Sequence, residues 1–196
     1  NLGTARIRIR SLLAALEERA SRTPAPIRAA KALEKRAKKI LFTRSMKENY
    51  TLLAPQMSPL HFQFLQAVFE KNGHPMEVLH HVDAATIEEG LKSVNNDACY
   101  PSIIVVGQVL QALKSGRYDP NRTAVVLAQT GGCCRATNYV ALMRKALADS
   151  GFDRVPVVAV ALSTALERHP GFKITLPLLR DALRGTLAGD LLMNVL

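Results

Sequence analysis

The side chains best suited to chemistry in this sequence are three cysteines in two short polar segments. Cys133 and Cys134 belong to segment 129–139, and Cys99 belongs to segment 95–101. Each segment leads into a predicted helix, and a thiol at a helix N-terminus is favoured as the thiolate. A thiolate attacks disulfides and ligates soft metals. The two segments are therefore the first candidates for a redox or metal site.

The residues around Cys134 suit such a site. Arg135 adds positive charge beside the thiol, and Gly131 and Gly132 permit close approach of a bulky ligand. Three cysteines are one short of a four-thiolate cluster, so a missing ligand would come from outside this sequence, from a partner or from a small molecule. A Gly-Gly turn before a helix is also common in proteins without a cofactor, and spacing alone leaves both interpretations open. No Gly-Lys-Ser or Gly-Lys-Thr follows, which excludes a Walker phosphate loop.

Strands and helices alternate from residue 50 to residue 161, which is the element pattern that must position the cysteines. The sequence predicts strands at 50–54, 76–79, 124–128 and 155–161, and helices from about 58 to 73, 84 to 90 or 95, 101 to 116, and 136 to 150. The last two strands are almost wholly apolar, which is typical of a parallel sheet covered on both faces. We therefore predict an α/β fold with a doubly wound, mostly parallel sheet of the flavodoxin-like or Rossmann-like kind.

The positive charge of the chain is concentrated at its N-terminus. The formal net charge is +10, and residues 1–48 contain 13 basic and 4 acidic side chains. Two helices are predicted there, one around Ile9 to Leu16 and one from about Ile27 to Ile40, each with an apolar stripe. Such helices pack on a neighbouring domain or lie on an acidic polymer or membrane surface. Nucleic acid is the less favoured partner because no aromatic residue precedes Phe42.

Three regions follow from these patterns. We expect a basic helical linker or docking segment at 1–48, an α/β domain at 49–165, and a helical segment at 166–196 that leads into a following domain. The chain would then be a piece of a longer protein. Its apolar runs are shorter than the roughly 20 residues of a membrane-spanning helix, and no signal peptide opens it. We expect a cytoplasmic protein without a membrane partner.

Two of these segments resemble a known protein family. Both cysteine segments look like signatures of the acyl-CoA dehydratase activase-related proteins, which belong with the activators and D-type subunits of 2-hydroxyglutaryl-CoA dehydratase and benzoyl-CoA reductase. The similarity covers about 45–196 and rests on 94–102 with Gly107 and Gln108, on 129–139, and on the supporting segments 50–59 and 189–193.

The resemblance implies an iron–sulfur protein of anaerobic metabolism. Such a protein would take part in ATP-coupled electron transfer at low potential, linked to the dehydration or reduction of an acyl-CoA. Cys99 and Cys134 match the positions that ligate a 4Fe–4S cluster in the family, whereas the family more often has glycine at the position of Cys133. Cys133 therefore ranks third as a metal ligand. The ATPase motifs of such proteins are missing here, so the partners would be an ATPase domain of the same chain or of another subunit, and an acyl-CoA enzyme. A dimer is possible.

Six further residues are predicted to contact the cofactor: Asn96, Asp97, Gly131, Gly132, Arg135 and Asn138. Four residues would donate hydrogen bonds that tune a cluster potential, but they are equally suited to turns and to the core: Asn95, Asn96, Asn138 and Tyr139. Asp97 would orient the cysteine loop or cap a helix. His61, His74 and His169 are isolated, and without convergent spacing we predict no shared metal site for them. Of His80 and His81, at the end of a strand, we expect one to pack and the other to face solvent. The alternative function is a non-catalytic α/β scaffold that docks an ATPase partner through the basic N-terminal helices.

Overall fold

The computed structural model describes residues 39–95, 97–129, 134–160 and 169–195, together with eight positions between residues 6 and 17. The chain divides into two units, Asn1–Arg36 and Ala37–Leu196. In the first unit the eight described residues are helical. The predicted second N-terminal helix lies, up to residue 38, outside the described residues.

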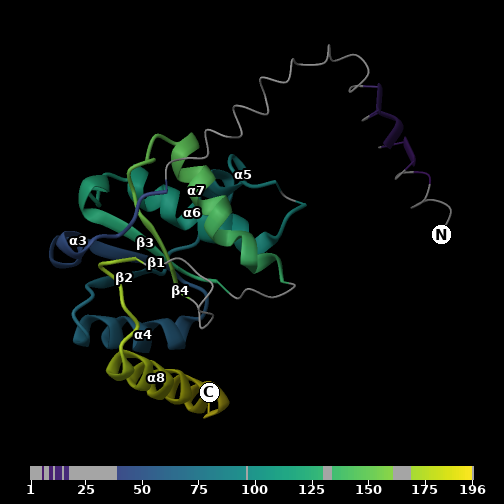
Figure 1. The fold of residues 1–196 in the computed structure, drawn as a ribbon. Coiled ribbons are helices and arrows are strands. Elements are labelled where there is room, and N and C mark those ends of the chain that lie inside the picture. The colour runs from purple at the N-terminus through teal and green to yellow at the C-terminus, as the bar shows by residue number, and fades with distance from the viewer. Residues whose placement is uncertain are drawn as a thin grey trace. The chain divides into compact units, whose positions relative to one another are not determined.

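The second unit is built on a four-stranded parallel sheet, shown in Figure 1. The strands are β1 (Thr51–Pro55), β2 (Met76–Leu79), β3 (Thr123–Ala128) and β4 (Val157–Val160), and their order in the sheet is β2-β1-β3-β4. All three neighbouring pairs are parallel; Leu53, for example, pairs with Glu77 on one side and Val125 on the other. The predicted doubly wound parallel α/β fold is confirmed, and this order is that of the first four strands of the flavodoxin-like arrangement.

Helices cover both faces of this sheet. Their bounds are α3 (Arg44–Asn49), α4 (Pro59–Lys71), α5 (Ala84–Leu91), α6 (Tyr100–Lys114), α7 (Tyr139–Asp149) and α8 (Leu176–Val195), with short 3-10 helices η1 (Pro120–Arg122) and η2 (Arg135–Asn138). Side chains of α6 and α7 pack on the face that carries Leu53, while α4 packs on the face that carries Leu52 and Ala54. The alternation of neighbouring strand residues between two apolar clusters follows from the two-residue period of a strand.

Helix boundaries follow the expected signals at several places. Pro59 starts α4 after Ser58, and Gly73 just beyond its end has a φ of +76°, which a glycine adopts without steric cost. The predicted stripe Tyr139, Met143 and Leu147 of α7 is buried. None of the described helices combines the length and hydropathy needed to cross a bilayer.

Other boundaries differ from the prediction. Helix α3 was not expected, and β4 begins at Val157 rather than Val155. Pro156, which has no N–H to donate, contributes only its carbonyl to the sheet by accepting a bond from Val125 N (2.8 Å). The helix expected from Ala136 begins as the 3-10 turn η2, and α7 starts at Tyr139.

Two glycines fix how α5 and α6 cross. Helix α5 ends at Leu91, one residue after Gly90, and Gly90 itself is buried, so that a Cβ there would strike the carbonyl of Ile103 in α6. A Cβ at Gly107 of α6 would strike the carbonyl of Thr86 in α5. The two backbones therefore approach closely only because both positions lack a side chain. This crossing sets where the N-terminus of α6, and Cys99 with it, is held.

Candidate functional site

The two cysteine segments meet at the edge of the sheet formed by the carboxyl ends of the strands. Segment 129–139 follows β3, and α6 runs back toward the start of β3, so the N-terminus of α6 lies at the same edge. The chain leaves β1 and β3 toward opposite sides of the sheet, which makes their carboxyl ends the topological switch point. In open parallel sheets, ligands bind in the crevice at such a point.

Cys99 is the N-cap residue of α6, and its side chain makes no capping bond to that helix. Its Sγ shares a hydrogen bond with the Tyr139 hydroxyl at 3.3 Å instead. The backbone carbonyl of Cys99 accepts bonds from the amide (3.0 Å) and the hydroxyl (2.6 Å) of Ser102. The main chain is thus fixed while the half-buried thiol points to another helix.

Cys134 occupies the equivalent position before η2. The thiol is exposed, and the amide of Ala136 lies 3.5 Å from its Sγ. The carbonyl of Cys134 accepts a bond from Thr137 N (3.1 Å), and Gln129 Nε2 donates to the Thr137 carbonyl (2.9 Å). Gln129, directly after β3, therefore braces the turn that presents this thiol.

Tyr139 is the side chain that bonds to the Cys99 thiol. It is only 4% exposed, and burial raises the pKa of its hydroxyl, with further contributions from the hydrogen bond to Cys99 and from negative charge at Cys99 and Cys134. The hydroxyl stays protonated at neutral pH and is available as a hydrogen-bond partner for sulfur.

Arg135 fastens the two segments together. Its Nη1 donates to the backbone carbonyl of Asp97 (3.0 Å) and to that of Ala98. The guanidinium group also brings positive charge to the entrance of α6, directly before Cys99. The contact uses the main chain of Asp97, while Asp97 N is held by the side chain of Asn95 (3.0 Å).

The other predicted site residues divide into two groups. Asn138 is exposed and precedes α7 without a side-chain capping bond. Asn96, Gly131, Gly132 and Cys133 lie outside the described residues. Within the described part of the chain, no three His, Cys, Asp or Glu side chains gather closely enough to hold a metal ion. The described residues therefore provide two thiols at most to a metal centre.

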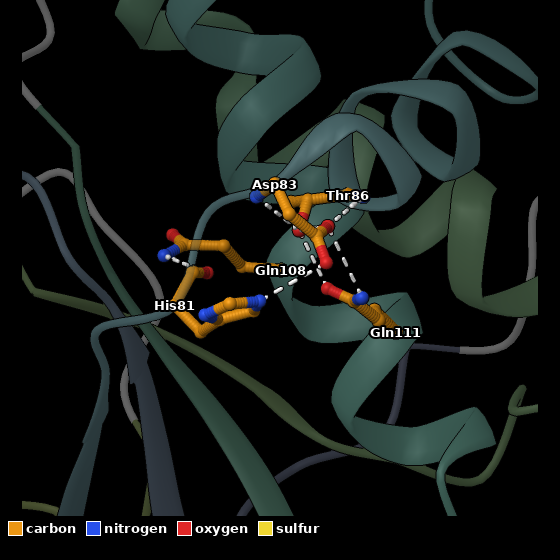
Figure 2. A network of polar contacts seen from close by, with 5 residues as sticks. All are labelled: His81, Asp83, Thr86, Gln108 and Gln111. Atoms are coloured by element: carbon orange, nitrogen blue, oxygen red, sulfur yellow. Dashed lines mark hydrogen bonds and ion pairs between the residues drawn. The ribbon is translucent and has the colours of Figure 1, made fainter.

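A second polar cluster, shown in Figure 2, was not identified from the sequence. Asp83 caps α5 by accepting from Thr86 N (2.7 Å), and the Thr86 hydroxyl also bonds to Gln111 of α6 (2.5 Å). His81 Nε2 lies 3.0 Å from Asp83 Oδ2. The bonds from Thr86 hold the pKa of Asp83 well below its usual range. The signal for this cap was Asp83 with Thr86 three residues later.

Gln108 connects this cluster to the sheet. Its Nε2 donates to the carbonyls of Leu79 (2.6 Å) and His81 (3.2 Å), and its side chain is 2% exposed. A hollow of about 360 Å³ lies beside it and is lined by Gln111 and Tyr118. A larger hollow of about 940 Å³ follows the free edge of β2. Neither hollow is lined by a residue of the cysteine segments.

A third polar chain links Ser58, His61 and Asp190. The Ser58 hydroxyl lies 2.8 Å from His61 Nδ1, and His61 Nε2 lies 2.9 Å from Asp190 Oδ1. These contacts join the N-terminus of α4 to the far end of α8. A Cβ at Gly189 would lie 2.7 Å from the His61 ring, so this glycine permits the approach.

Comparison of the chain with protein-family models, with curated proteins and with solved structures gave no match. The resemblance of the cysteine segments to the activase-related proteins therefore stays a prediction. The functional interpretation rests on the local geometry of the site.

Proposed function

We propose that the chain is an iron–sulfur redox module whose cluster is bound by Cys99 and Cys134. The observation that carries the proposal is that Arg135, next to Cys134, donates to the backbone carbonyls of Asp97 and Ala98 directly before Cys99, at the edge of the sheet where ligands bind. A 4Fe–4S cluster supplies a one-electron carrier whose potential depends on hydrogen bonds to sulfur and on burial. Through its resemblance, the module would take part in ATP-coupled, low-potential electron transfer to an acyl-CoA enzyme.

The donor set fits such a group in part. The two described thiols are free, and thiolate is the ligand that iron–sulfur clusters prefer. Cys133 stands next to Cys134 in the sequence and is the third candidate ligand. Remaining positions would be filled by a partner or by a small thiol.

The residues around the thiols have separate roles in this proposal. Arg135 holds the loop before α6 against the turn after β3, which fixes the distance between the thiols. Its charge, with the N-terminus of α6, would stabilise negative charge on a cluster bound at this position. The Tyr139 hydroxyl donates to sulfur and stabilises negative charge there.

The test is anaerobic reconstitution with iron and sulfide in the presence of a small thiol, which supplies any ligand that the chain lacks. Iron content and electron paramagnetic resonance would be measured for the wild type, for Cys99→Ser and for Cys134→Ser. We expect a cluster signal in the wild type and its loss in both variants. Tyr139→Phe is the matched control, because it keeps every thiol, and it should retain iron with a changed reduction potential.

The proposal fails if the wild type binds no more iron than a chain carrying both Cys99→Ser and Cys134→Ser. Cys133→Ser decides the rank of the third thiol. Unchanged iron in that variant leaves Cys99 and Cys134 as the protein ligands, and a loss of iron adds Cys133 to them.

One observation favours the alternative scaffold function. The apolar stripe of the first unit is more than half exposed at each of its described positions: Ile9, Leu12, Leu13 and Leu16. This stripe could therefore bind a partner. Under this function the basic helices would bind an ATPase domain. Deleting residues 1–44 should then abolish binding, and retained affinity at physiological salt would contradict it.

A further inference from the structure

Helix α8 is the outermost layer of the second unit, beyond α4 (Figure 1). Its residues Leu178, Asp181, Gly185 and Gly189 are buried. The Cβ and backbone of Phe64 in α4 lie against Gly185, and the His61 ring lies against Gly189. The opposite side of α8 carries large exposed apolar residues. No other element of the described chain covers that side.

The exposed side has the spacing of a coiled-coil seam. Its residues alternate at intervals of four and three: Leu176, Arg180, Leu183, Leu187, Asp190 and Asn194. Leu183 and Leu187 are 60% and 54% exposed, and Arg180 and Asp190 are 57% and 61% exposed. Leu183 and Leu187 stand opposite the buried Gly185, because each is two residues, roughly 200°, from it. Intervals of this kind keep one helix face against a partner helix.

This seam is complementary to itself. Leu183 and Leu187 are equally far from Gly185 along the helix, and so are Arg180 and Asp190. An antiparallel copy aligned at Gly185 therefore places leucine against leucine at the centre and arginine against aspartate on both sides. We propose that this face of α8 binds the same face of a second copy of the chain, as an antiparallel helix pair.

The charges of Arg180 and Asp190 favour a second copy of the chain as the partner and an antiparallel direction for the helix pair. In a parallel pair, Arg180 would meet Arg180 and Asp190 would meet Asp190, which is repulsive. Polar residues in such a seam fix register and direction at some cost in affinity. Within one chain, Arg180 Nε bonds to Asp181, and Asp190 Oδ1 bonds to His61. The side chains of Arg180 and Asp190 nevertheless stay more than half exposed, so both can still contact a second copy.

The first experiment measures self-association of the 196-residue chain by sedimentation equilibrium. We expect a reversible dimer, and for Leu183→Glu with Leu187→Glu a rise of at least about tenfold in the dissociation constant, because central apolar contacts carry most of the binding energy. Met193→Glu is the matched control. Met193 is 56% exposed on the same helix but lies outside the seam, and its substitution should leave the dimer unchanged. Circular dichroism would verify that each variant keeps its helices.

The second experiment tests the direction. Arg180→Asp and Asp190→Arg should each weaken the dimer, and a chain with both substitutions should regain it, because the opposite charges face each other again. Single variants that dimerise like the wild type would overturn the antiparallel pair. A wild type that stays monomeric up to roughly 300 µM overturns the whole proposal, since specific interfaces of standard size bind with micromolar or tighter affinity. None of these outcomes bears on iron binding.

Discussion

The N-termini of α5 and α6 lie toward opposite ends of this antiparallel helix pair, since Gly90 meets Ile103 and Thr86 meets Gly107, and they are built differently. At α5, Asp83 accepts bonds from the amide and the hydroxyl of Thr86, and its cap is extended to Gln111. At α6, the cap residue Cys99 leaves its own helix uncapped and directs its thiol to Tyr139. The start of α5 is capped by side chains close in sequence, whereas the thiol at the start of α6 bonds to a residue 40 positions away. The cap of α5 thus stabilises its helix, while the corresponding residue of α6 presents a thiol.

The crossing of α5 and α6 supports both helix starts, so disturbing it should have the largest effect. Gly107→Ala places a methyl group against the Thr86 carbonyl, and overpacking of this kind costs roughly 1–3 kcal/mol or more. Urea unfolding would measure the loss. Gly185→Ala is the comparison, since its Cβ would be 3.3 Å from Phe64 Cβ, and it should cost clearly less. Equal stability of both variants would show that the helices can move apart.

Removal of the α5 cap should come next. Asp83→Ala should lower the free energy of unfolding by about 1–2 kcal/mol, as for other N-caps. Asp83→Asn keeps a side-chain acceptor and should lose less at neutral pH. If the comparison between the helix starts holds, Asp83→Ala leaves the labelling rate of Cys99 by a thiol reagent unchanged. A faster rate would show that the two helix starts are coupled.

The same cap should make stability depend on pH. The pKa of Asp83 is lowered in the folded state, chiefly by the Thr86 amide, whereas its value in the unfolded chain is about 4. Its contribution is therefore present above pH 4 and is lost as the pH falls below that value. Thermal unfolding of the wild type from pH 7 to pH 3 should show a steeper decline than that of Asp83→Asn. Parallel curves would assign the decline to other carboxylates.

Tyr139→Phe tests the α6 side of the comparison. Loss of the hydroxyl removes the hydrogen bond to Cys99 and should cost about 1 kcal/mol in unfolding free energy. Cys99 should then be labelled faster. Tyr118→Phe is the matched control, because the Tyr118 hydroxyl bonds to Glu77 far from the thiols. It should lose similar stability without any change at Cys99.

The smallest effect on stability is expected for Arg135→Ala. Arg135 is exposed, so the free energy of unfolding should change by less than about 0.5 kcal/mol. Hydrogen exchange of the amides at 97–99 and 134–137 should nevertheless become faster, since the variant separates the two segments. Arg117→Ala, which breaks an exposed pair with Glu77, is the control and should leave those amides unaffected.

Much of the fold could be predicted because its signals are local. The apolar runs at β3 and β4, the proline that starts α4 and the glycine after it each determine a segment through a few neighbouring residues. Helix α3 and the 3-10 start of segment 135–138 escaped prediction because both are short and carry no complete periodic pattern. Gly90 was expected as a possible end of α5, yet it is the site of contact with α6. The presence of glycine in the sequence does not by itself distinguish a helix end from a close contact between helices.

The sequence by itself determined the parallel α/β architecture, the concentration of positive charge in the first 48 residues and the placement of all three cysteines before helices. Only the tertiary structure decided that Arg135 joins the two segments and that the Tyr139 hydroxyl bonds to Cys99. Periodicity and capping act within a few residues. The order of the strands and the crossing at Gly90 and Gly107 depend on packing between distant parts of the chain, and these set the distances at the site.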